Sequence, residues 1–86
     1  MINEIKKVKD WMMEFGQEVP SKMNMPEQKI IDLRIELIGE EYDELVTALE
    51  KKHIVATADA LADLLYVIFG TVVALGIKEE TMLEIF

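Results

Sequence analysis

Apolar residues recur at intervals of three and four along most of the chain, the spacing that places side chains on one face of an α-helix. The pattern predicts four helices, over residues 2–16, 27–51, 54–75 and 78–86, without strand-like alternation. Gly16 and Gly76 suit helix ends, and both prolines, Pro20 and Pro26, fall between the first two predicted helices. We therefore expect one all-α domain over residues 1–86, an antiparallel bundle of about four helices.

The apolar positions exceed what a small single core needs. The second predicted helix carries a heptad-like seam that should face a neighbouring helix, with spacings of 4, 3, 4, 3 and 4: Ile31, Ile35, Ile38, Tyr42, Leu45 and Leu49. Residues 54–77 are almost wholly apolar, but Asp59 and Asp63 lie among them, which favours a helix buried in a bundle over a membrane span. With 51% hydrophobic residues in 86, we expect a homodimer or homotetramer.

Net charge and the lack of cysteine limit which partners and which chemistry the chain can have. The net charge is −8, from 17 acidic and nine basic residues, so the chain lacks the basic face that nucleic acids and anionic membranes require. There is no cysteine, which excludes disulfides and thiolate chemistry and fits a cytoplasmic location. The excess of acidic residues is compatible with metal binding, and with phosphate binding when a metal ion lies between the acids and the phosphate.

Carboxylates break the apolar pattern of both long helices. A helix turns 100° per residue, which places Glu41 and Glu44 on a half-buried flank of the second helix and Glu40 nearer its polar side. Asp59 and Asp63 share one stripe of the third helix. An antiparallel hairpin centred near residue 51 or 52 would bring Glu44 level with Asp59, and Glu41 nearly level with Asp63.

Four carboxylates converging between two helices would raise each other's pKa, and a divalent cation would remove that conflict. Oxygen ligands without histidine or cysteine favour Mg²⁺ or Mn²⁺. Two other interpretations remain open. A run such as EEYDE is also typical of a solvated helix face, and hydroxyl groups or a wet dimer interface could satisfy the two aspartates.

Two motifs together resemble a known family. Glu40–Leu45 reads EExxEL, and Asp59–Gly70 reads DALADLLYVIFG, followed by ALGI. They resemble the MazG-like all-α nucleoside triphosphate pyrophosphohydrolases, especially the small single-domain branch of bacteria and phages. The resemblance implies an oligomer of helical bundles with a nucleotide substrate. It also implies Mg²⁺-dependent cleavage of a (d)NTP to the monophosphate and pyrophosphate, in the house-cleaning of nucleotide pools.

The resemblance also assigns roles to individual acids. Glu41 and Glu44 match the metal-binding acids of EExxE, Glu40 matches the acid that assists the metal or the water, and Asp59 matches the aspartate of a second motif, ExxD. The glutamate of ExxD would fall at position 56, where this chain has Ala56, and Asp63 is the candidate to replace it. A catalytically impaired assembly or binding module of the same fold is therefore the alternative function.

Overall fold

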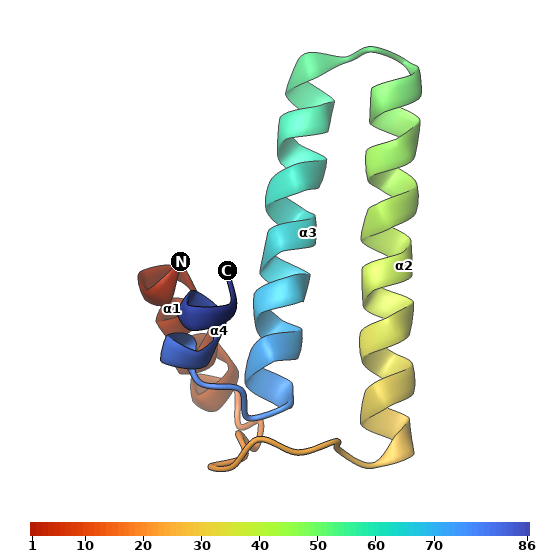
Figure 1. The fold of residues 1–86 in the computed structure, drawn as a ribbon. Coiled ribbons are helices and arrows are strands. Elements are labelled where there is room, and N and C mark those ends of the chain that lie inside the picture. Colours follow the sequence, from red (N-terminus) through yellow and green to blue (C-terminus); the bar gives the residue numbers. More distant parts are fainter.

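Four helices and no strand make up the computed structural model, which describes all 86 residues (Figure 1). The helices are α1 (Ile2–Glu14), α2 (Gln28–Glu50), α3 (Ile54–Ala74) and α4 (Glu79–Ile85). The all-α fold class predicted from the spacing of apolar residues is confirmed. Each predicted helix is present, and its ends lie within two residues of the expected positions.

The two long helices form an antiparallel hairpin closed by the short turn at residues 51–53 (Figure 1). His53 begins α3 as its N-cap: its Nδ1 accepts a hydrogen bond from the amide of Ala56 at 3.1 Å, and its carbonyl accepts one from Oγ1 of Thr57 at 2.8 Å. A capped start satisfies amide groups that a helix leaves unpaired at its N-terminus. The turn thus fixes the relative height of α2 and α3.

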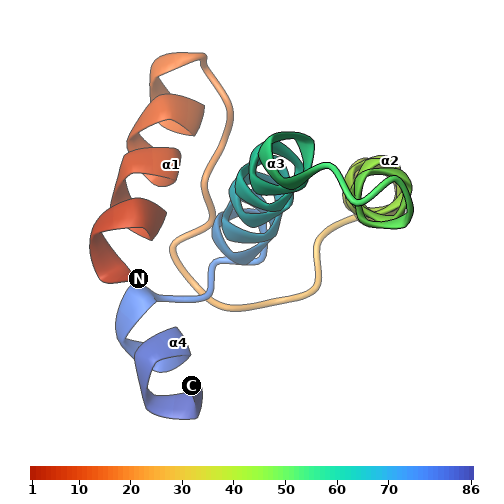
Figure 2. The ribbon, with the colours of Figure 1, turned by 90° about the horizontal axis from the view of Figure 1, so that it is seen from above.

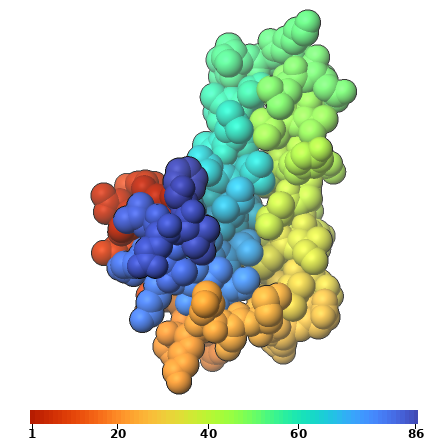
Figure 3. Space-filling view, in the orientation of Figure 1, coloured from red at the N-terminus to blue at the C-terminus, as the bar shows by residue number.

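The main core lies at the end of the hairpin away from this turn. There α1 packs on α3 and α4 packs beside α1, whereas α2 packs on α3 alone (Figure 2). The buried apolar residues of this core come from α1 and the last turns of α3: Ile5, Val8, Met12, Val72, Val73 and Ala74. Because α1 and α4 cover only the lower part of α3, the turn end of the hairpin projects beyond them (Figure 3).

The connection between α1 and α2 passes against the end of α3. The amide of Asn24 donates a hydrogen bond to the carbonyl of Leu75 at 3.0 Å. Gly76, at φ +69°, lies so close to this segment that a Cβ atom would overlap the carbonyl oxygen of Lys22. Glycine is required here both for the left-handed backbone and for the close approach.

Half of the apolar seam of α2 is left exposed. Ile35, Tyr42 and Leu49 are 64%, 58% and 55% exposed, so no helix of this chain covers them. The buried positions near the turn are instead small residues, Ala48 on α2 with Thr57 and Ala60 on α3, which let the two helices approach closely. The expected contact of the seam with a neighbouring helix is therefore only partly made within the chain: Ile31, Ile38 and Leu45 are half-buried, whereas the other three positions stay exposed.

Helix α3 has an exposed apolar side as well. By length and composition it is the one helix that could cross a membrane, and 22% of its most apolar window is buried within the chain. Its large exposed apolar side chains are Ile54, Val55, Leu61, Leu65, Tyr66 and Ile68. Together with Ile35, Tyr42 and Leu49 of α2, these are large apolar side chains that a single chain leaves uncovered.

Candidate metal and substrate site

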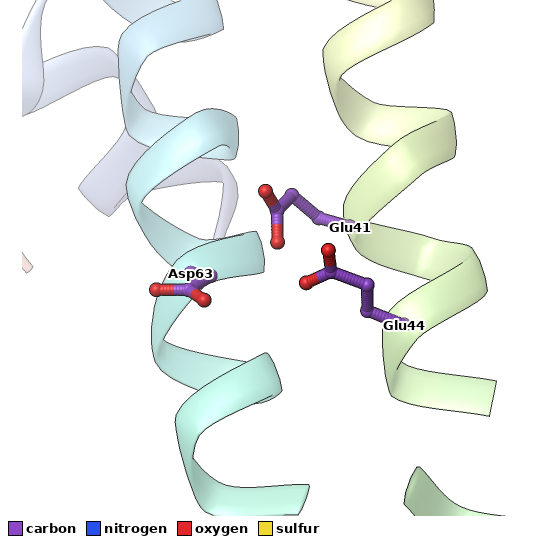
Figure 4. Close-up of side chains that lie close together, drawn as sticks. All are labelled: Glu41, Glu44 and Asp63. Carbon is purple, nitrogen blue, oxygen red and sulfur yellow. The ribbon is translucent and has the colours of Figure 1, made fainter. Parts of the chain in front are cut away.

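Three carboxylates meet between the two long helices. Glu41 and Glu44 reach from α2 toward Asp63 on α3, and one carboxylate oxygen from each lies within 4.8 Å of the other two (Figure 4). We call these three residues the carboxylate cluster. Glu41 is half-buried, whereas Glu44 and Asp63 are exposed to solvent. The cluster is thus accessible to an ion from outside.

The direction of helical side chains explains which aspartate joins the cluster. The Cα–Cβ bonds of a helix tilt toward its N-terminus. On α2 this tilt carries Glu44 away from the turn, while on the antiparallel α3 it carries Asp59 and Asp63 toward the turn. Glu44 therefore meets Asp63, although its Cα was expected to be level with that of Asp59.

The cluster is electrostatically unbalanced. Oε2 of Glu41 is buried and has no hydrogen-bond partner. Burial raises the pKa of the Glu41 carboxyl above its ordinary value, and the negative charges of Glu44 and Asp63 raise it further. The two ion pairs of the structure, at Glu4 and Glu27, lie elsewhere. No basic side chain of the chain neutralises these three acids.

These features fit a divalent cation. Carboxylate oxygens are the hard ligands that Mg²⁺ and Mn²⁺ take in proteins, and Mg²⁺ commonly uses one or two of them while keeping water or phosphate at its other positions. The unpartnered Oε2 of Glu41 supplies a ligand that nothing else in the chain engages. The residues that could hold the ion are therefore Glu41, Glu44 and Asp63.

Two pockets flank the cluster. The tip pocket, of about 550 Å³, lies toward the turn and is lined by Asp43, Glu44, Thr47, Ala48, Lys51, His53, Ala56, Asp59, Ala60 and Asp63. The base pocket, of about 340 Å³, lies toward α1 and is lined by Val8, Met12, Gln17, Arg34, Leu37, Glu41, Asp63, Tyr66, Val67 and Gly70. Asp63 borders both, so a cation held by the cluster would lie where the pockets adjoin.

The other acids predicted for the site lie outside the cluster. Asp59 is exposed and lines the tip pocket with Glu44. Glu40 is exposed on α2 and lines neither pocket. Ala56 is half-buried in the wall of the tip pocket, so an acidic side chain at this position would enter that pocket. The roles assigned to Glu40 and Asp59 by resemblance stay predictions.

Arg34 contributes a positive charge that the spacing of acids did not reveal. Its side chain crosses from α2 to α3, where Nε donates to Oγ1 of Thr71 at 3.1 Å and Nη2 donates to the carbonyl of Val67 at 3.2 Å. Trp11 of α1 and Tyr66 of α3 lie near this region as a tilted aromatic pair, with ring centroids 5.9 Å apart. The base pocket therefore combines acids, a guanidinium group and apolar side chains.

The sequence was compared with known protein families. Residues 6–86 match the family described as phosphoribosyl-ATP pyrophosphohydrolase. The chain belongs to this family. It is an all-α pyrophosphohydrolase family related to MazG, so the resemblance drawn from EExxEL and DALADLLYVIFG is confirmed. The comparison with curated proteins found no match. Membership assigns the chain to pyrophosphohydrolases, which hydrolyse acid anhydride bonds.

Proposed function

We propose that the chain is a Mg²⁺-dependent nucleotide pyrophosphohydrolase, in which Mn²⁺ can replace Mg²⁺. It would cleave a ribo- or deoxyribonucleoside triphosphate between the α and β phosphates, releasing the monophosphate and pyrophosphate. The carboxylate cluster, with its unpartnered Glu41 oxygen, is the observation that carries the proposal. The family's own description names phosphoribosyl-ATP, an ATP with an added phosphoribosyl group, which contains the same triphosphate bond.

The position of each acid suggests its role in the reaction. Glu41, Glu44 and Asp63 would hold the cation. A bound divalent cation polarises phosphate oxygens and lowers the pKa of a coordinated water. Glu40, next to Glu41 on the exposed side of α2, is the acid assigned to assist the metal or the attacking water. Asp59 would act from the tip pocket, where it accompanies Glu44.

The test is the initial rate of pyrophosphate release with Mg²⁺. The substrates are the common ribo- and deoxyribonucleoside triphosphates and phosphoribosyl-ATP. We expect release from at least one of them, and loss of activity with chelator or in Glu44→Gln. Glu36→Gln is the matched control, because Glu36 is an exposed acid of the same helix that lines neither pocket. Absence of pyrophosphate release with every substrate would contradict the proposal.

Ala56 supports a second candidate, a module that kept the fold and lost turnover. This residue stands where the family resemblance expects a glutamate, and it leaves an apolar position in the wall of the tip pocket. Such a module would still bind Mg²⁺ and nucleotide, and would release no pyrophosphate. The same assay, combined with a nucleotide-binding measurement, separates the two functions.

We further propose that the protein acts in the cytoplasm as a homodimer or homotetramer. The exposed apolar side chains of α2 and α3 support this, because apolar surface beyond what a single chain covers is often buried against a partner. A second copy would supply a matching apolar surface from the same two helices. A tetramer would join two such dimers through a second interface.

A further inference from the structure

Arg34 is a half-buried cation without a counter-ion. Arginine has five N–H donors, and two of those in Arg34 are used on Oγ1 of Thr71 and the carbonyl of Val67, both neutral acceptors, which leaves three. Burial lowers the pKa of its guanidinium group, because it disfavours the charged form. Charged groups removed from water are normally paired, yet neither ion pair of the structure involves Arg34, in a chain with 17 acidic residues.

A glycine makes room for this guanidinium group. A Cβ atom on Gly70 would lie 2.8 Å from Nη2 of Arg34, closer than side chains normally approach. Glycine is unfavourable inside a helix compared with alanine, and Gly70 lies within α3. Glycine at this position therefore makes α3 less stable than alanine would, and the Arg34 side chain occupies the space that the missing Cβ atom leaves.

Position relates Arg34 to the carboxylate cluster. It precedes Glu41 by seven residues, which is two turns of α2 and about 10 Å along the helix axis on the same face. Both residues line the base pocket, together with Asp63. The pocket thus has acids suited to a metal near one end and a guanidinium group with free donors further along it.

We propose that Arg34 binds a phosphate group of the substrate directly, at the part of the base pocket away from the carboxylate cluster. The phosphate would be one that the metal does not hold. It could belong to the pyrophosphate part of the triphosphate or to a phosphoribosyl group, since the guanidinium fork recognises both in the same way. This inference rests on the proposed function, because it takes a nucleotide as the occupant of the base pocket.

The experiment measures equilibrium binding and so does not depend on turnover. The full chain, in excess Mg²⁺, is titrated with inorganic pyrophosphate and separately with ribose 5-phosphate by calorimetry. We expect Arg34→Lys, which keeps the charge and loses the planar fork, to weaken binding of at least one probe by about tenfold or more. A loss limited to pyrophosphate would assign the triphosphate, and one limited to ribose 5-phosphate would assign the phosphoribosyl group.

Gly70→Ala provides a second variant that keeps Arg34. The added methyl group must displace the end of the flexible arginine side chain, so it should weaken the same probe. Gly39→Ala is the matched control, since a Cβ atom there meets nothing within 4 Å. Titration with Mg²⁺ alone should give the same affinity in all these proteins, which shows that the fold and the cluster are intact.

Two results would overturn the assignment of Arg34. One is binding of both probes with unchanged affinity in Arg34→Lys and Gly70→Ala, and the other is no binding of either probe by the unmodified chain. Failure of the proposed function would look different. In that case no nucleotide would be hydrolysed, while the dependence of phosphate binding on Arg34 would persist and support the inference.

Discussion

Replacing Glu44 by glutamine should uncouple the stability of the protein from Mg²⁺. The substitution keeps the size of the side chain and removes one of the three charges that lie within 4.8 Å of one another. An ion that binds only the folded chain raises the free energy of unfolding by about 1.4 kcal/mol when its free concentration is about ten times Kd. For a domain of this size, that corresponds to a rise of about 6–11 °C in Tm.

The variant should retain little of this rise. Loss of one charged ligand weakens binding by about tenfold or more. At the same Mg²⁺ concentration the stabilisation then falls to about 0.4 kcal/mol or less, or about 2–3 °C in Tm. In chelator the variant should be at least as stable as the original chain, because a like charge beside Glu41 has been removed.

The assay is thermal unfolding followed by circular dichroism across a Mg²⁺ series, at one fixed protein concentration because self-association also shifts Tm. Glu36→Gln, with an exposed acid removed from the same helix, should respond to Mg²⁺ as the original chain does. An equal rise in Glu44→Gln and the original chain would remove Glu44 from the metal site.

Three further outcomes follow from the same geometry. The family resemblance expects an acid at position 56, in the tip pocket beside Asp59, so in Ala56→Glu calorimetry should show Mg²⁺ affinity increased by about tenfold; unchanged affinity would mean that position 56 does not face a metal site. In chelator, stability should fall as pH rises above 4.5, because the folded chain holds the Glu41 proton to higher pH than the unfolded chain does. Unfolding in urea at several pH values should show a flatter pH dependence in Glu41→Gln, and identical profiles would refute this account of Glu41. Sedimentation at micromolar concentration should give a dimer or tetramer, whereas a 9.9 kDa monomer would leave the exposed apolar surface unexplained.

Local signals in the sequence were sufficient for the helices. Apolar spacing, Gly16, Gly76 and the two prolines located all four, since helix formation and helix ends depend on neighbouring residues. The turn at residues 51–53 then fixed the height of α2 against α3, which predicted that acids from the two helices would meet. The sharper result, that Asp63 rather than Asp59 joins Glu41 and Glu44, needed the tilt of Cβ atoms in addition to the height of Cα atoms.

The rotation of α2 about its own axis, which decides the face it turns to α3, could not be predicted from local sequence patterns. The regular seam of α2 suggested contact with a neighbouring helix along its whole width, but small residues such as Ala48 and Ala60 let α2 pack on α3 through an adjacent face, which leaves half of the seam exposed. The same rotation carries Arg34 across to Thr71, 37 residues away in the chain. A contact of this kind depends on the packing of two helices, so nothing near Arg34 or Gly70 in the sequence predicts it.

The most direct measurement of the central claim is identification of the products by ³¹P NMR. The chain is incubated with Mg²⁺ and each candidate triphosphate, including phosphoribosyl-ATP, and the phosphorus resonances are followed over time. Our account predicts that the triphosphate signals of at least one substrate are replaced by those of a monophosphate ester and pyrophosphate, and that Glu41→Gln prevents the change. Triphosphates that stay intact throughout, or that yield orthophosphate and a diphosphate, would contradict it.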